Sequence, residues 1–214
     1  MWRPSANRRR WTDDVEAPMR VRPEILARCA QEIESPPKAI LRRLILPLIQ
    51  RRLRIAVMGR GGHWARKARV RGARFGHYAS FGHSAEFNGP VVVGDLTMLS
   101  SGVQVIGNDH GMRTPTRPMR LDFADKPRPV TVIEAECWVG SRVTIIEGVR
   151  IGRGSVIGSG ALVTRDVPPY SVVHGVPARV VRQRFTPEEQ AEHDRMLYGR
   201  AEAQGGWPAP GAPS

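Results

Sequence analysis

Apolar side chains recur every six residues along two stretches of this chain. Twelve six-residue units open with an apolar residue, although only 41% of the chain is hydrophobic. Chance would give such a run with a probability of roughly 10⁻⁵, and a six-residue period fits neither a helix nor a simple alternating strand. The positions are Phe75, Phe81, Phe87, Val93, Leu99, Val105, Ile133, Val139, Ile145, Ile151, Ile157 and Val163.

Two further positions of each unit are also restricted in size. A small or β-branched residue stands four places after most anchors, and glycine often stands one place after. This pattern predicts an all-β solenoid in which each unit is a short strand plus a turn, and three units complete one coil. We expect the large residue to fill the interior, the small one to fit at a corner, and the glycine to relieve the bend.

The repeat is interrupted once, between Val105 and Ile133. The separation of these two anchors is not a multiple of six, and a polar loop over about 108–130 lies between them. A long loop on a rigid scaffold is often functional. His110 is the one histidine of six that falls in this loop. A solvated side chain is the alternative interpretation of a single loop histidine.

Helical patterns flank the repeat. Residues 23–33 predict a short helix that begins at Pro23. Residues 39–53 predict an apolar helix that is kinked or stopped near Pro47 and either caps the solenoid or lies on an anionic membrane. We favour the cap, because Pro47 would break the long face that a membrane anchor needs. Thr186 predicts the N-cap of a C-terminal helix over about 187–204.

The chain therefore divides into three parts. We expect a basic N-terminal extension with short helices over 1–68, a solenoid domain over 69–185, and a C-terminal helix with a disordered tail over 186–214. Residues 1–74 carry 19 Lys and Arg against 6 Asp and Glu, whereas residues 75–214 carry 14 of each. The basic excess suits phosphates or anionic lipid, but no nucleic-acid motif accompanies it.

Composition restricts the expected cellular location and chemistry of the protein. No apolar stretch approaches the ~18 residues of a membrane-spanning helix, and the basic N-terminus lacks the pattern of a secretory signal. The two cysteines, Cys29 and Cys137, are too few for a disulfide framework, so we expect a reducing cytoplasm, with membrane association as the alternative. Cys137 falls at an inward position and is rejected as a nucleophile. No spacing gathers several histidines or carboxylates, so no metal is expected.

Four segments together resemble the C-terminal coils of hexapeptide-repeat acetyltransferases. The similarity runs over roughly residues 75–184, is densest in 131–182, and is greatest to the galactoside, maltose and nodulation-factor acetyltransferases and the colanic-acid-type sugar O-acetyltransferases. The segments are Trp138-Val139-Gly140-Ser141, Glu147-Gly148-Val149-Arg150-Ile151-Gly152, Val163-Thr164-Arg165-Asp166-Val167-Pro168-Pro169 and Gly175-Val176-Pro177-Ala178-Arg179-Val180-Val181.

The resemblance implies a left-handed parallel β-helix that forms a homotrimer, with each site between two subunits. It also implies that His110 is the catalytic base and that the backbone N–H of Ser141 stabilises the oxyanion. Acetyl-coenzyme A would be the acyl donor, and Asn88 would face the acceptor. The residues that match coenzyme A positions are Trp138, Ser141, Ser159, Gly160, Thr164, Arg165, Arg179 and Arg182.

The acceptor is the least constrained part of the prediction. The leading hypothesis is direct transfer to a hydroxyl of a sugar or polysaccharide precursor. An aminosugar N-acetyltransferase or a xenobiotic acetyltransferase of the same fold is the runner-up. A carbonic-anhydrase-like metal solenoid is disfavoured because His110 lacks histidine partners, and a non-catalytic scaffold has only the basic N-terminus in its support.

Overall fold

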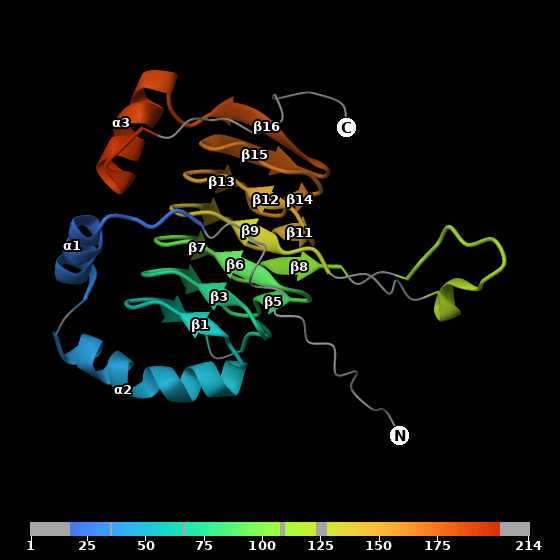
Figure 1. Cartoon of the computed structure of the whole chain (residues 1–214), viewed down its shortest axis with the longest axis horizontal. Helices are drawn as coiled ribbons and strands as arrows, with labels where there is room; N and C mark the ends of the chain where they lie inside the picture. Colours follow the sequence, from blue (N-terminus) through green and yellow to red (C-terminus); the bar gives the residue numbers. More distant parts are fainter. Residues whose placement is uncertain (1–17, 35, 66, 108–109, 123–127, 202–214) are drawn as a thin grey trace.

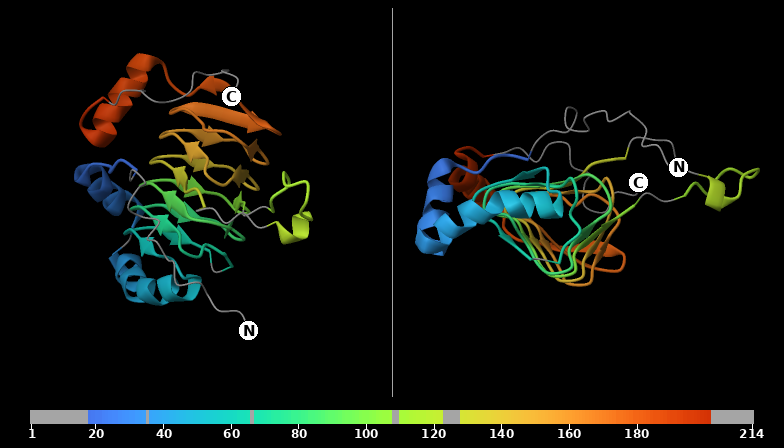
Figure 2. Two further views of the ribbon diagram at one scale, coloured as in Figure 1. Left: turned by 45° about the vertical axis from the view of Figure 1, so that its right-hand side comes forward. Right: turned by 90° about the horizontal axis from the view of Figure 1, so that it is seen from below.

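The computed structural model describes residues 18–34, 36–65, 67–107, 110–122 and 128–201. The expected disordered tail therefore lies almost wholly outside the described residues. The described chain forms a three-sided prism of stacked parallel strands, with helices at its ends and along one edge (Figures 1 and 2). The solenoid predicted from the six-residue repeat is confirmed.

Each side of the prism is one sheet. The first sheet contains β1 (Val57–Met58), β3 (Arg74–Phe75), β6 (Val91–Val93), β9 (Thr131–Ile133) and β12 (Arg150–Ile151). The second contains β2 (His63–Trp64), β4 (Ser80–Phe81), β7 (Met98–Leu99), β10 (Trp138–Val139), β13 (Val156–Ile157), β15 (Ser171–Gly175) and β16 (Ala178–Gln183). The third contains β5 (Glu86–Phe87), β8 (Gln104–Ile106), β11 (Thr144–Ile146) and β14 (Leu162–Val163).

Successive coils stack in register at the predicted spacing. Phe75 pairs with Val93, and Ile133 pairs with Ile151, so three six-residue units complete each of these coils. All twelve anchors are buried, and so are the described small residues four places after them. Among the described strands, only the last pair, β15 and β16, is antiparallel. The anchors therefore form one continuous core along the prism axis.

The glycines that follow the anchors have a different role from the one expected. Gly94 does not have a positive φ, and a Cβ there would lie 2.5 Å from the backbone N of Ala135 in the next coil. The left-handed residue of the turn stands three places after the anchor instead, as at Leu96 and Gly160. Glycine is thus required by the close approach of the stacked coils, not by the bend.

The β-helix begins earlier than the expected residue 69. Met58 pairs with Phe75 and Trp64 pairs with Phe81, so the first coil is one residue shorter than the coils that follow. That missing residue shifts the repeat out of phase, which is why the count of six did not extend to the first coil. Val70 is fully buried and occupies the third anchor position of this coil.

The N-terminal helices are α1 (Pro23–Ile33), which has the expected bounds, and α2 (Pro36–Leu53). The expected stop at Pro47 is wrong, because α2 continues through it. Proline removes one backbone donor, but Pro47 and Arg43 both lie on the exposed side, where water can bind the freed carbonyl. Viewed along the prism, α2 lies across its N-terminal end (Figure 2).

The C-terminal helix α3 (Pro187–Tyr198) has the predicted capping box between Thr186 and Glu189. It ends before the expected residue 204, because Gly199 adopts the left-handed conformation that terminates helices. Asp194 joins α3 to the prism by accepting hydrogen bonds of 2.7 and 2.6 Å from Arg153 and one of 2.6 Å from the Tyr170 hydroxyl. No described helix is both long and apolar enough to span a bilayer.

Candidate functional site

The interrupting loop leaves the prism where the third sheet turns into the first. We call this edge the 3–1 corner. The loop follows β8, and its described residues 110–122 lie well outside the prism (Figure 1). Gly111 N–H donates to the Asp122 carbonyl over 2.7 Å, which closes the outer part of the loop on itself. His110 is exposed at the start of this part, so its ring is accessible to a reactant.

The two ends of the loop are fastened to the same corner. The Asn88 side-chain amide donates to the Gly107 carbonyl over 3.0 Å, and Arg128 Nε donates to Glu147 over 2.9 Å. Arg128 also donates to the backbone carbonyl of Asn88. Asn88, predicted to face the acceptor, therefore lies at the loop base. No signal in the sequence indicates Arg128 and Glu147, because they form an ion pair across coils.

A second group of predicted residues lies at the edge between the second and third sheets, the 2–3 corner. Ser141 N–H donates to Ser159 Oγ over 3.2 Å, and Gly160 N–H donates to the Ser141 carbonyl over 2.8 Å. Trp138, at the start of β10, is 54% exposed. A Cβ on Gly160 would meet no atom within 4 Å, so this surface is open to an approaching ligand.

The remaining predicted residues lie in three places: near the 2–3 corner, on the second sheet and at the 3–1 corner. Arg179 pairs with His174 at the tip of the β15–β16 hairpin, which lies directly over Gly158 and hence near the 2–3 corner. Arg182 lies further along β16, opposite Val172. Thr164 and Arg165 follow β14 and lie exposed at the 3–1 corner. The structure thus gathers most, but not all, of the predicted coenzyme A residues.

Within one chain, the loop histidine and the main group of coenzyme A residues do not meet. His110 leaves from the 3–1 corner, whereas Ser141, Ser159 and Gly160 lie at the 2–3 corner, across the full width of the third sheet. A loop that projects away from its own prism can instead reach the corner of a neighbouring one. A site that contains both groups would therefore need two chains.

The densest part of the repeat carries a family match. Residues 131–165 match the family model described as bacterial transferase hexapeptide (six repeats). This segment includes the anchors from Ile133 to Val163 and the Ser141 and Ser159 turns of the 2–3 corner. Over this segment the chain is therefore similar to the hexapeptide-repeat bacterial transferases.

Curated members of the family match part of the chain. A chloramphenicol acetyltransferase from Escherichia coli is 52% identical over 59 residues, which is 28% of each chain. The galactoside O-acetyltransferase of Escherichia coli K12 is 36% identical over 106 residues, half of each chain. The chain therefore matches at most about half the length of these two relatives.

Solved structures extend the likeness over most of the fold. A hexapeptide-repeat containing acetyltransferase from Vibrio cholerae superposes with a TM-score of 0.56 at 22% identity, over 76% of this chain and 90% of that one. Galactoside acetyltransferase in complex with coenzyme A gives 0.50 at 23% identity, over 78% and 81%. The prism is therefore the left-handed parallel β-helix that the sequence resemblance implies, an exception to right-handed crossover connections.

The described residues give no support to a cysteine nucleophile or to a metal site. Cys137 is fully buried, where its thiol donates to the Gly152 carbonyl over 3.2 Å and burial raises the pKa of the thiol. A buried, protonated thiol is a poor nucleophile. Among the described residues, no three or more histidine, cysteine or acidic side chains converge as metal ligands.

Proposed function

We propose that the protein is an acetyl-coenzyme A-dependent O-acetyltransferase that acts on a hydroxyl of a sugar or polysaccharide precursor. The observation that carries this proposal is that the chain has both an exposed loop histidine and, in the segment matched by the family model, an open 2–3 corner. The galactoside O-acetyltransferase relative favours a sugar acceptor. The corner residues Trp138, Ser159 and Gly160 would bind the pantetheine arm, and Arg179 and Arg182 would bind the phosphates through their forked donors.

The proposed reaction is a direct transfer in which His110 is the general base. A neutral imidazole accepts the hydroxyl proton while the hydroxyl oxygen forms a bond to the thioester carbonyl carbon. The carbon–sulfur bond then breaks, and the coenzyme A thiolate accepts the proton from the imidazolium. No residue forms a covalent intermediate.

The oxyanion that forms in this reaction needs a hydrogen-bond donor. We assign this role to the backbone N–H of Ser141, which donates to Ser159 Oγ in the structure. Ser159 is exposed, so its hydroxyl can rotate away when a stronger acceptor arrives. An anionic oxygen is a stronger acceptor than a hydroxyl, so the exchange favours the transition state.

The protein would act as a homotrimer with three sites between subunits. The separation of His110 from the 2–3 corner within one chain supports this arrangement. Thr164 and Arg165, at the other corner, would then border the site from the chain that donates His110. We expect the enzyme in the cytoplasm, either free or in peripheral contact with a membrane through its N-terminal part.

A xenobiotic acetyltransferase is a second candidate function. The identity of 52% with a chloramphenicol acetyltransferase favours it specifically, although the match covers 59 residues. The same histidine chemistry applies to any hydroxyl acceptor. An aminosugar acceptor would also fit, with an amine in place of the hydroxyl.

A thiol-release assay with acetyl-coenzyme A tests the proposal. The acceptor panel contains neutral sugars, aminosugars and chloramphenicol, and the control variant is Glu192→Ala, which changes an exposed side chain of α3 away from both corners. We expect His110→Ala to lower turnover by about 10²- to 10⁴-fold and the control to leave it unchanged. Full turnover by His110→Ala on the preferred acceptor would refute the mechanism.

A further inference from the structure

Helix α2 is apolar on two faces, and the prism covers only one. The side chains of Ile45, Leu46, Ile49 and Leu53 are half-buried, and Leu53 packs against the prism core. The opposite side chains are Ile40, Leu41, Leu44 and Leu48, between 58% and 69% exposed, and we call them the outer face of α2. An exposed group of large apolar side chains with charged residues around it marks an interaction site, so this face fits a second apolar surface.

The charge around the outer face identifies what that surface is. Residues 35–85 contain twelve Lys and Arg and no Asp or Glu. Arg43, Arg51 and Arg52 are exposed and border the outer face on α2 itself. A second copy of the chain would bring two strongly cationic surfaces together, which electrostatic repulsion opposes. The complementary surface is therefore anionic as well as apolar.

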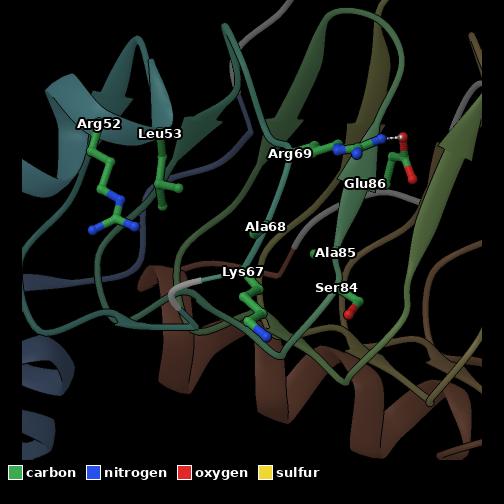
Figure 3. A pocket seen from close by; sticks show the side chains of 8 residues that line it. All are labelled: Arg52, Leu53, Lys67, Ala68, Arg69, Ser84, Ala85 and Glu86. Atoms are coloured by element: carbon green, nitrogen blue, oxygen red, sulfur yellow. Dashed lines mark hydrogen bonds and ion pairs between the residues drawn. The ribbon is translucent and has the colours of Figure 1, made fainter.

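A cationic pocket lies at the C-terminal end of α2. It has a volume of about 530 Å³, and Figure 3 shows Arg52 of the helix and Lys67 of the first coil among the side chains that line it. Arg69 in the same wall forms an exposed ion pair with Glu86 at 3.3 Å. Within the part of the chain that the structure describes, Arg52 and Lys67 are in no ion pair. None of the predicted site residues lines this pocket.

We propose that the outer face of α2 docks the protein on an anionic membrane surface. The four apolar side chains would enter the boundary between headgroups and acyl chains, while Arg43 and Arg51 stay at the level of the lipid phosphates. Arg52 and Lys67 would bind a lipid phosphate at the pocket. The continuity of α2 through Pro47 removes the reason for which the sequence favoured a cap alone.

The docked orientation keeps both corners accessible. Because α2 lies across the N-terminal end of the prism, the prism axis would stand away from the membrane (Figure 2). In the proposed trimer, three parallel prisms would present three such helices on one side. Each helix after the first would bind at a high effective concentration, so weak single contacts would add up to stable attachment.

Co-sedimentation of the full chain with vesicles tests the surface. We expect binding to phosphatidylcholine vesicles that contain phosphatidylserine, and much weaker binding to phosphatidylcholine alone or at high salt. Leu44→Asp with Leu48→Asp should lower the bound fraction on the order of tenfold or more. The matched control is Met196→Asp, which changes an exposed apolar residue on α3 and should leave binding unchanged.

Other measurements on the same double variant distinguish the alternatives. Light scattering should give the same mass as for wild type; a smaller assembly would show that the outer face joins copies of the chain and would overturn the proposal. Equal vesicle binding by wild type and variant, or no binding by wild type, would also overturn it. Thiol release without vesicles should not change, so failure of the docking proposal is separate from failure of the proposed enzyme activity.

Discussion

At the scale of single residues, two glycine positions of the repeat have different requirements. One needs glycine because the next coil lies too close for a Cβ, and the other because its φ is positive. We expect Gly94→Ala to lower the free energy of unfolding by about 2–3 kcal/mol, because its Cβ would press on the backbone of the next coil. Gly160→Ala should cost only about 1 kcal/mol, because it meets open space and suffers only from its positive φ. Denaturant titration of both variants measures the difference, and equal losses would contradict this account.

Glu136 makes stability depend on pH. Burial alone would raise the pKa of Glu136, but the adjacent His193 side chain, the hydrogen bonds from Arg184 and the Arg184 charge lower it overall. A carboxyl whose pKa is lower in the folded state stabilises the fold above its unfolded pKa of about 4.5, and this contribution is lost as the pH falls through the folded value.

Glu136→Gln should therefore destabilise the protein at pH 7 and less so in acid. We expect the difference in unfolding free energy from wild type, about 1–2 kcal/mol at neutral pH, to shrink as the pH falls below about 4.5. Denaturant midpoints across this range measure it. Glu192→Gln, an exposed change on α3, should show little difference at any pH. If the difference between Glu136→Gln and wild type did not change with pH, Glu136 would not be the source of the pH dependence.

At the scale of elements, α3 is held by a buried ion pair. Arg153 and Asp194 have side chains only 5% and 2% exposed, and Asp194 also accepts from Tyr170. Asp194→Ala would leave the Arg153 charge buried without this partner, so we expect a loss of about 3–5 kcal/mol in unfolding free energy. Chemical denaturation checks this, with Glu192→Ala as the exposed control, and a loss below about 1 kcal/mol would be inconsistent with it.

The elements also show what the sequence could predict. The anchors, α1 and the capping box of α3 follow from local patterns, because burial and capping restrict the residue types at fixed spacings. The first coil does not follow from the six-residue count, because the chain is one residue shorter between Val70 and Phe75 and the repeat changes phase there. Pro47 predicts a kink or stop, but α2 does not stop there, because exposure to water removes much of the cost of a missing backbone bond.

The candidate site was predictable only in part. His110 stood out because it lies in the single break of the repeat, and the corner residues came from the family resemblance. The fastening of the loop by Arg128 and Glu147 joins positions that are distant in the sequence and adjacent only across coils, which no local pattern indicates. The role of Asn88 toward the acceptor stays a prediction, and its side chain hydrogen-bonds to Gly107 and Arg128 at the base of the loop.

At the scale of the whole molecule, the proposed site between subunits predicts complementation. His110→Ala and Ser159→Trp should each abolish most turnover, the first by removing the base and the second by filling the 2–3 corner. Hybrid trimers of the two variants, isolated with two different affinity tags, should regain about one third of wild-type thiol release. One of their three sites then combines an intact histidine with an intact corner on the next chain.

The same experiment distinguishes a site within one chain. Such a site would always contain one of the two changes, so hybrids would stay inactive. Reassembled wild-type trimers that carry both tags provide the reference for full activity. Hybrids that remain below a few per cent of this reference would rule out the shared site.

The register across the loop has a consequence for how such proteins diversify. Val93 pairs with Ile133, Leu99 with Val139 and Val105 with Ile145, so all three sheets cross the insertion with the same offset and no strand is shifted relative to the others. The inserted segment can therefore change in length or sequence without disturbing the pairing of the three sheets. We therefore expect the loop that carries His110 to tolerate replacement, while the core and the turns that carry Ser141 and Ser159 keep their fit.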